Sequence, residues 1–194
     1  MRSQQREATR QRIVDAALQA ISESGFEVST RSIANLANVS QGLLTYHFKS
    51  KEELWRAAAD QLFAMHNQSL KAVVETCDSN DPRELRRETI RQLVRFNAEH
   101  PEFFRFMMQN GSQNNDRSRW LVDTHLRPFF KQFSELMGRG IPEDDLPHAF
   151  YVLAGAAGTI FSAPNECKRL TGITATTRNA ITRHADYVAD LIVP

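Results

Sequence analysis

A short run of polar side chains in the first third of the chain carries groups that can recognise nucleic acid. Gln41 and Thr45 stand one helical turn apart, so on a helix they share one face. A glutamine amide can form two hydrogen bonds with the edge of an adenine, and a threonine can bond to several bases. Tyr46, His47 and Lys51 add a hydroxyl, an imidazole and an ammonium group that suit phosphate oxygens. The chemistry of this run is that of contact with DNA.

Two short helices joined by a tight turn would position these side chains. Ile33, Ala34 and Ala37 give the first helix one apolar face. Asn38 tolerates the left-handed conformation that ends many helices, and Ser40 is a good N-cap for a second helix over residues 41–47. This is the spacing of a helix-turn-helix, whose second helix enters the major groove. An ordinary helical corner has the same spacing, but its exposed face seldom carries Gln, Thr, Tyr and His together.

The expected DNA contacts include residues that read bases and residues that fix the position of the backbone. Gly42 lacks a side chain, so its helix can approach the groove closely. The alternative for His47 is a packing role, and its position beside Tyr46 favours contact. The expected set is Ser29, Thr30, Arg31, Ser40, Gln41, Gly42, Thr45, Tyr46, His47, Lys49 and Lys51.

The same segment resembles the DNA-binding domain of the TetR family of bacterial transcription regulators. The resemblance lies in T-x-x-I-A from Thr30, A-x-V-S-x-G from Ala37 and Y-H-F-K-S-K-E-E-L from Tyr46. It implies a helix-turn-helix domain over residues 1–56 and an effector-binding and dimerisation domain over residues 57–194. Many relatives carry Tyr where this chain has Thr45, which suggests a different base preference.

The composition favours an intracellular DNA-binding protein over a membrane protein. The 194 residues carry a net charge of +1, but residues 1–51 hold seven basic and four acidic residues, a net of +3 that leaves −2 for the rest. No apolar run reaches the ~18 residues of a membrane span, and the first thirty residues lack the apolar core of a signal peptide. Cys77 and Cys167 have no metal-binding spacing and suit a reducing compartment. We expect a protein of the bacterial cytoplasm.

Helical periodicity extends along the chain and no strand pattern appears, so the predicted fold class is all-α, with about nine helices. Residues 1–8 are expected to be frayed. Ser50 and Glu53 form a capping box, Asp81 is an N-cap after a polar break over residues 77–82, and Pro128 should kink or divide its helix. The remaining helices are expected over residues 9–24, 50–77, 82–99, 101–109, 117–138, 145–163 and 175–192.

The aromatic-rich middle of the chain is a candidate binding site for an apolar molecule. Aromatic and Met residues at helical spacing are usually plain core, and about half of these should be core whatever the function. The family resemblance implies a small-molecule pocket among these helices. The candidate lining is His66, Phe103, Phe104, Phe106, Met107, Trp120, His125, Phe129, Phe130 and Phe133.

The last two predicted helices are the candidate dimer interface. Paired with a second copy they would form a four-helix bundle across a two-fold axis, as the resemblance also implies. The alternative is that their small residues pack inside one subunit. The expected interface residues are Tyr151, Ala154, Gly155, Gly158, Ile181, His184, Ala185 and Val188.

Enzymatic readings have little support, because no H-E-x-x-H, G-x-S-x-G, P-loop or G-x-G-x-x-G occurs and the six histidines are scattered. We therefore expect no catalysis, no metal and no cofactor. The resemblance implies a homodimeric repressor that leaves double-stranded operator DNA when a small hydrophobic or amphipathic effector binds. The alternatives are a ligand-independent dimeric DNA-binding protein or an activator and, remotely, a helical small-molecule enzyme.

Overall fold

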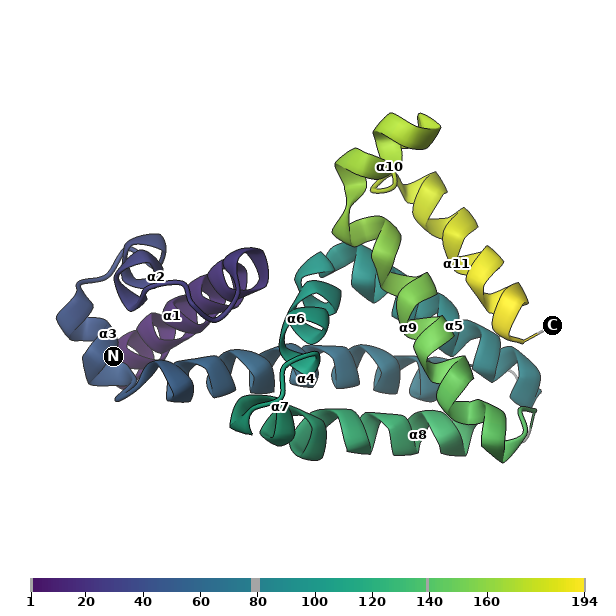
Figure 1. Ribbon diagram of the computed structural model, residues 1–194, viewed down its shortest axis with the longest axis horizontal. Coiled ribbons are helices and arrows are strands. Elements are labelled where there is room, and N and C mark those ends of the chain that lie inside the picture. The colour runs from purple at the N-terminus through teal and green to yellow at the C-terminus, as the bar shows by residue number, and fades with distance from the viewer. Residues whose placement is uncertain (1, 78–80, 139, 194) are drawn as a thin grey trace.

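The computed structural model describes residues 2–77, 81–138 and 140–193, and this part of the chain contains helices and no strand, which confirms the all-α fold class. Helices α1 to α3 lie at one end of the long α4, and the later helices pack along the rest of it (Figure 1). The helices are α1 (Arg2–Ser24), α2 (Thr30–Leu36), α3 (Gln41–His47), α4 (Lys51–Thr76), α5 (Pro82–Glu99), α6 (Pro101–Gly111), α7 (Asp116–Leu121), α8 (Arg127–Met137), α9 (Leu146–Ser162), α10 (Pro164–Thr171) and α11 (Arg178–Ile192), with a π-helical turn at Val122–Leu126 and a 3-10 turn at Glu143–Asp145.

Three serines start three successive helices in the same way. The hydroxyls of Ser29, Ser40 and Ser50 accept hydrogen bonds from backbone N–H groups three residues on, at 3.0, 3.1 and 3.0 Å. Each bond satisfies one of the donors that a helix start leaves unpaired. The Glu53 carboxylate accepts from the N–H of Lys49 at 2.9 Å, one residue earlier than a reciprocal capping box would place it. Local sequence thus sets the starts of α2, α3 and α4.

Two apolar cores lie along α4. The first joins α1, α2 and α3 to α4, α6 and α7, with Trp55, Phe63 and Phe106 among its largest fully buried side chains. The second joins α5, α8, α9 and α11 and includes Phe133 and Phe161. Because the first core contains residues of α6, it ties the N-terminal helices to the later ones. The predicted domain boundary at residue 56 falls inside α4 and stays a prediction.

The helix bounds differ from the predicted ones at the N-terminus. Residues 2–8 are helical and not frayed. The guanidinium carbons of Arg6 and Arg10 lie 5.6 and 5.1 Å from the ring centres of Tyr46 and Phe48, and these contacts hold the start of α1 against α3. The expected cap at Asp81 is confirmed by its bond from the N–H of Arg83 at 2.8 Å. The rest of that predicted polar break, residues 78–80, lies outside the described residues.

The described helices also outnumber the nine that were expected. The helix expected over residues 117–138 is divided by the π-helical turn, because Pro128 has no N–H to continue the α-helical bonding. A further helix, α10, begins at Pro164 and ends at Gly172, whose φ of 76° is left-handed. Among the described residues no single helix is long and apolar enough to cross a membrane, although Glu143–Ser162 and Pro164–Thr171 meet the test together across a bend of 83°.

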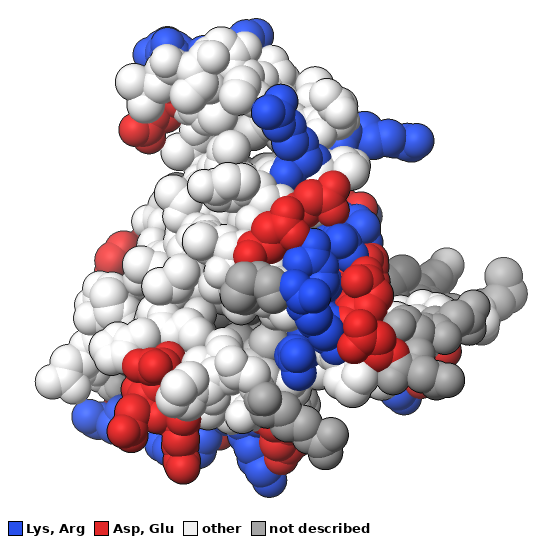
Figure 2. Space-filling model, turned by 90° about the vertical axis from the view of Figure 1, so that its right-hand side faces the viewer, with Lys and Arg blue, Asp and Glu red and all other residues white. Residues whose placement is uncertain are grey.

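A strip of ion pairs fixes α11 on α5. Arg91 lies 2.9 Å from Asp186 and 2.8 Å from Glu84, and Arg87 pairs with Asp190. Figure 2 shows such interleaved basic and acidic side chains beside a broad uncharged area. The strip orients α11, so that one of its faces packs inside the chain and another faces solvent.

Candidate DNA interface and ligand cavity

The exposed face of α3 is held in place by hydrogen bonds to α2 and within α3. The amide nitrogen of Gln41 donates to the hydroxyl of Thr30 at 3.0 Å, and the Thr45 hydroxyl donates to the Gln41 carbonyl at 3.0 Å. Asn38, with φ of 53°, makes the left-handed turn between the two helices as its residue type suggested. Gln41 and Thr45 are exposed, and the Gln41 amide oxygen remains accessible for a base edge.

Aromatic and basic side chains surround this face. Tyr46 is 66% exposed, and its ring packs edge-on against His47 with 5.4 Å between centres. Partial burial, and then the charges of Arg6 and Arg10, lower the pKa of His47 below its ordinary value of 6.5. This shift favours the neutral form of His47, which can still donate a hydrogen bond to a phosphate.

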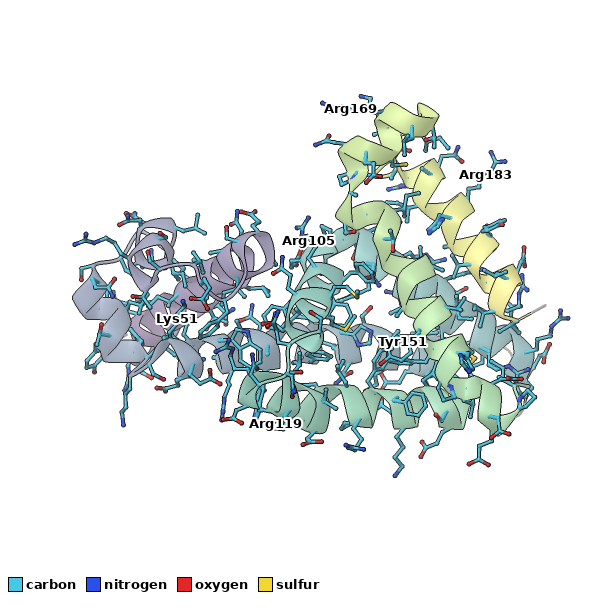
Figure 3. The ribbon with its side chains drawn as sticks, viewed as in Figure 1. Lys51, Arg105, Arg119, Tyr151, Arg169 and Arg183 are labelled. Atoms are coloured by element: carbon cyan, nitrogen blue, oxygen red, sulfur yellow. The ribbon has the colours of Figure 1, made fainter. Side chains whose placement is uncertain are left out.

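Three basic residues are placed in ways that the sequence did not indicate. Arg10 lies beside α3, although it was not among the expected contacts; its spacing from Arg6 on α1 was the available signal. The ammonium of Lys51, which is labelled in Figure 3, lies 4.4 Å from the ring centre of Phe26. The guanidinium of Arg117 lies 3.5 Å from the centre of the same ring. A phosphate contact by Lys51 therefore requires its flexible side chain to leave that ring, and it stays a prediction.

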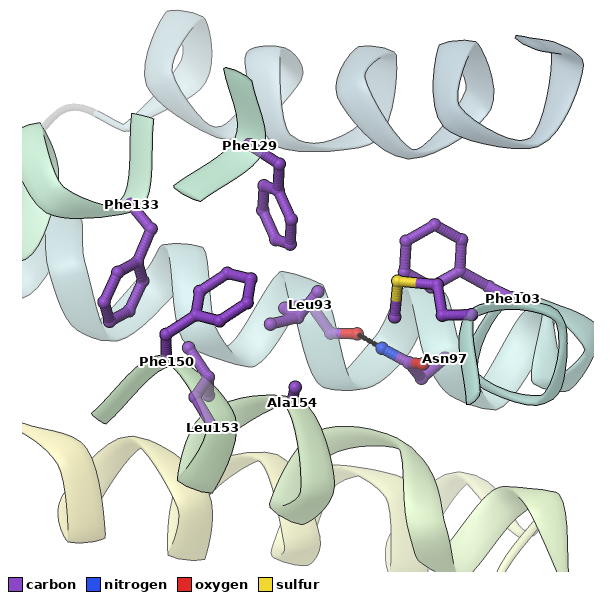
Figure 4. A pocket seen from close by; sticks show the side chains of 9 residues that line it. Leu93, Asn97, Phe103, Phe129, Phe133, Phe150, Leu153 and Ala154 are labelled. Carbon is purple, nitrogen blue, oxygen red and sulfur yellow. Dashed lines mark hydrogen bonds between the residues drawn. The ribbon is translucent and has the colours of Figure 1, made fainter. Parts of the chain in front are cut away.

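A small apolar cavity lies between α5, α6, α8 and α9 (Figure 4). Its volume is about 20 Å³, enough for one or two water molecules and too small for a ligand. The lining is Leu93, Asn97, Phe103, Met107, Phe129, Phe133, Phe150, Leu153 and Ala154.

An open apolar groove of about 420 Å³ lies next to this cavity, between α4, α5 and α8. The two spaces share Leu93, Phe129, Phe133 and Leu153, so these side chains form the wall between them. Groove and cavity together have the size range of small-molecule sites. The other groove residues are Asn67, Leu70, Lys71, Val74, Thr89, Ile90, Gln132, Leu136 and Met137.

The ten residues expected to line a ligand site separate into two groups. Phe103, Met107, Phe129 and Phe133 line the cavity, and the His66 ring stacks on Phe103 at 4.7 Å. The other five do not line the cavity in this structure, and their place in a ligand site stays a prediction: Phe106 and Trp120 pack on Trp55, His125 stacks on Phe63 and bonds to Asp60 at 2.9 Å, Phe104 lies against Gly158, and Phe130 packs on Phe150.

Sequence reasoning missed the α5 and α9 sides of the cavity. Leu93 and Asn97 come from α5, and Phe150 and Leu153 come from α9, which was assigned to the dimer interface alone. Asn97 was detectable in principle, since an amide among the apolar positions of α5 is an unusual core residue.

His66 is a fully buried, neutral histidine on α4. Desolvation lowers its pKa to about 4. A hydrogen bond with Asn67 acts in the opposite direction and is the smaller of the two effects. Its ring also contacts Phe96 and Phe129 edge-on, at 5.2 and 4.7 Å. A protonated His66 would place a charge among aromatic rings, so folding favours the neutral form.

We expect the protein to lose stability in mild acid because of His66. Its folded pKa of about 4 lies below the ordinary 6.5, so the unfolded chain takes up the proton first. The stabilisation is complete above about pH 6.5 and falls as the pH drops toward 4, by about 3 kcal/mol in all. Urea unfolding at about pH 7.5 and about pH 5 measures the change.

Two variants separate His66 from the other histidines. His66→Phe should reduce the pH dependence, and His148→Gln, at an exposed histidine, should leave it unchanged. An equal slope in the wild type and His66→Phe would contradict the assignment.

The comparisons with known proteins concern first the N-terminal helices. The family model "Bacterial regulatory proteins, tetR family" matches residues 13–58, which run from α1 through α2 and α3 into α4. Residues 13–58 thus match the DNA-binding domain of the TetR family. Among curated relatives, the HTH-type transcriptional repressor NicS of Pseudomonas putida is 31% identical over 104 residues, 53% of this chain and 48% of NicS. The chain thus matches about half the length of this relative.

Solved structures extend the likeness in fold to nearly the whole length of the chain. AibR, in complex with isovaleryl coenzyme A and operator DNA, superposes with a TM-score of 0.74 at 16% identity, covering 96% of this chain and 98% of AibR. FadR of Bacillus subtilis, in complex with stearoyl-CoA, gives 0.66 at 17% identity, covering 94% and 97%. At these identities the likeness establishes the fold.

The expected dimer residues also divide into two groups. Tyr151 is 76% exposed on α9 (Figure 3), and Ala154, Gly155 and Ile181 are half-buried. His184 is half-buried too, and its ring nitrogen Nε2 bonds to the Ala156 carbonyl at 2.8 Å, which links α11 to α9 within the subunit.

Three of those residues lie inside the chain, which corrects the expectation for them. Ala185 and Val188 are buried in the core that contains α5, because the apolar stripe of α11 packs against that helix. Gly158 is buried as well, and a Cβ there would lie 2.4 Å from the Phe104 ring. Its lack of a side chain serves close packing inside one subunit.

A set of exposed apolar side chains lies on α9, α10 and α11 and the turn after α10, and Tyr151 is its one member among the expected interface residues. Large apolar side chains that remain exposed together on neighbouring helices often mark an interaction surface. We call this set the C-terminal apolar face; it consists of Tyr151, Val152, Leu170, Ile173, Tyr187 and Leu191.

Proposed function

We propose that this chain is a TetR-family transcriptional repressor of the bacterial cytoplasm, which binds double-stranded operator DNA as a homodimer. The exposed face of α3 is the observation that carries the proposal. Gln41, Gly42, Thr45 and Tyr46 stand on a helix whose start is capped by Ser40 and which is tied to α2 by the Gln41–Thr30 bond. The residues of the expected DNA-contact set remain our proposed contacts.

The known proteins support the same function. NicS is named a transcriptional repressor, and the AibR structure contains both operator DNA and an acyl coenzyme A. Their overall likeness supports a repressor that responds to a small molecule. We assign the effector to the groove and cavity between α4, α5, α6, α8 and α9, which have the apolar lining that such a molecule needs.

Helix α6 provides a route from the cavity to the DNA-binding helices. Phe103 and Met107 line the cavity from α6. At the other end of α6, the Gln109 amide donates to the Ser22 carbonyl of α1 at 3.1 Å, and the Trp55 indole of α4 donates to Asn110 at 3.1 Å. An effector that enlarges the cavity would move α6, and with it α1 and α4.

Such a movement would change the separation of the two α3 helices in a dimer. Both must sit in successive major grooves, about 34 Å apart, for full affinity. A coupling of about 1–3 kcal/mol between effector and DNA would lower operator affinity about 5- to 150-fold. The effector needs only to bind the DNA-incompetent state more tightly.

Two substitutions on the α3 side should weaken DNA binding in different ways. Gln41→Ala should cost about 1–3 kcal/mol at the operator and reduce discrimination against altered bases, because a base contact is lost. Lys49→Ala should weaken binding to all sequences alike and reduce the slope of log affinity against log salt by about one per subunit. Fluorescence anisotropy with operator and scrambled DNA at several salt concentrations measures both effects.

Lys131→Ala is the matched control, since this exposed lysine lies on α8 and pairs only weakly with Glu135 at 3.9 Å. It should change neither affinity nor slope. Equal loss of specificity in Gln41→Ala and Lys49→Ala would remove the assignment of Gln41 to base reading.

A ligand-independent DNA-binding dimer is the second candidate, and the small volume of the cavity favours it. The cavity holds about 20 Å³. Operator binding that no apolar compound weakens, measured across a chemically diverse library, would favour this candidate over the effector-controlled one.

A further inference from the structure

One buried amide in the cavity lacks a hydrogen-bond donor. Asn97 is 3% exposed, and its Nδ2 donates to the Leu93 carbonyl at 2.8 Å. That bond fixes the orientation of the carboxamide, because a carbonyl can only accept. The Oδ1 atom is then buried and receives no hydrogen bond from the described residues. Figure 4 shows Asn97 beside Phe103, with the bond to Leu93 drawn as a dashed line.

A second buried polar atom without a partner lies near the same rings. His66 is fully buried, and no described residue bonds to its Nε2. Its Nδ1 lies 3.4 Å from the Asn67 Oδ1, which makes Nδ1 the protonated nitrogen and leaves Nε2 as an acceptor. The His66 ring stacks on Phe103 and meets Phe129 edge-on, and both phenylalanines line the cavity. One unsatisfied acceptor thus belongs to the cavity lining, and a second belongs to a ring that packs on two of the lining phenylalanines.

The lining offers no buried charge to an ionised ligand. The cavity lining contains no ionisable residue, and in the groove only Lys71 carries a charge. Lys71 is exposed and lies 3.5 Å from Glu75, which partly neutralises it. Burying an isolated carboxylate in such surroundings would cost several kcal/mol. An uncharged group that donates hydrogen bonds would satisfy acceptors whose burial is otherwise unfavourable.

We propose that the effector is an uncharged molecule with an apolar body and a hydroxyl or amide donor, and that the donor binds Oδ1 of Asn97. The apolar body would occupy the groove, and the donor would enter the cavity past the shared wall of Leu93, Phe129 and Phe133. The name effector rests on the proposed function, because it assumes that the bound molecule controls DNA binding. The binding preference itself is a property of Asn97 and its surroundings.

Three probes of nearly equal size test the donor requirement with the full chain in the absence of DNA. They are 1-octanol, which donates; heptyl methyl ether, which only accepts; and octanoate, which is ionised at about pH 7.5. Titration calorimetry should give at least about tenfold tighter binding of octanol than of the ether or octanoate, because only octanol brings a donor to the buried acceptor. Tighter binding of octanoate or the ether, equal binding of all three, or binding of none would overturn the proposal.

The variant Asn97→Leu removes the acceptor and keeps a side chain of similar size. Octanol and the ether should then bind equally, and Thr159→Val, which removes an exposed hydroxyl of α9 outside both the groove and the cavity, should keep the preference. If Asn97→Leu does not fold, the preference of the wild type among the three probes decides the matter alone. Operator binding is measured separately, so failure of the donor preference and failure of the repressor function are distinguishable.

Discussion

Tyr151→Glu is expected to make the protein monomeric and to lower its operator affinity by about 100-fold or more. Tyr151 is 76% exposed and lies on the C-terminal apolar face, where we propose that two copies meet. In a two-fold interface each substitution occurs twice, and an unpaired buried charge costs about 3–5 kcal/mol. A monomer presents only one α3 to the operator and loses the gain from simultaneous binding of two half-sites. Analytical ultracentrifugation and operator anisotropy measure the two effects.

Met108→Glu is the matched control for that substitution. Met108 is 58% exposed and lies on α6, outside the C-terminal apolar face. The variant adds the same charge at an exposed apolar position and should remain dimeric with unchanged affinity. A dimer that survives Tyr151→Glu and also Tyr187→Glu, on α11, would move the interface away from this face.

The apolar and charged surfaces of the last helices are consistent with this location. The ion pairs of Arg87 and Arg91 with α11 occupy one side of that helix, and Tyr187 and Leu191 remain exposed on it. An uncharged area beside the charged strip can meet a second copy without burying ions (Figure 2).

Trp55→Ala is expected to lower the free energy of unfolding by about 4 kcal/mol, the cost of removing a fully buried aromatic side chain. Trp55 lies at 0% exposure where α4 meets α6, stacked on Phe106 with 5.6 Å between ring centres and edge-on to Trp120 at 5.5 Å. The substitution leaves a cavity and also removes the donor to Asn110. Urea unfolding followed by circular dichroism measures the loss.

Trp55→Phe separates packing from hydrogen bonding. It keeps an aromatic ring and leaves the Asn110 Oδ1 without its donor, so the loss should be about 1–3 kcal/mol. Because Trp55 and Gln109 join α6 to the DNA-binding helices, we expect Trp55→Phe also to weaken the coupling between effector and DNA. A loss below about 1 kcal/mol in Trp55→Ala would show that the first core tolerates a cavity there.

The helix-turn-helix was predictable because local interactions form it. Ser40 and Ser50 cap helices through backbone groups three residues away, and Asn38 takes the left-handed turn through its own conformational preference. The apolar residues of α2 recur on one face of the helix, so Ile33 and Ala34 are buried whichever helix packs against that face. Such features need no knowledge of distant residues.

The division of the aromatic residues between the cores was decided by tertiary structure. Phe103 and Phe106 lie three residues apart on α6, yet one lines the cavity and the other packs on Trp55. Helical period places residues on a face and does not name the helix opposite that face. For the same reason the sequence predicted an apolar site but not its α5 and α9 walls.

What the sequence by itself determined was the helical class, the starts of α2, α3 and α4, and the exposed polar face of α3, since each follows from residues within a few positions of one another. Only the tertiary structure decided that Gly158 and Val188 pack inside the subunit, and that Asn97 meets Phe103 at a cavity. These outcomes depend on contacts between helices far apart in the chain, where small changes in helix rotation exchange one neighbour for another.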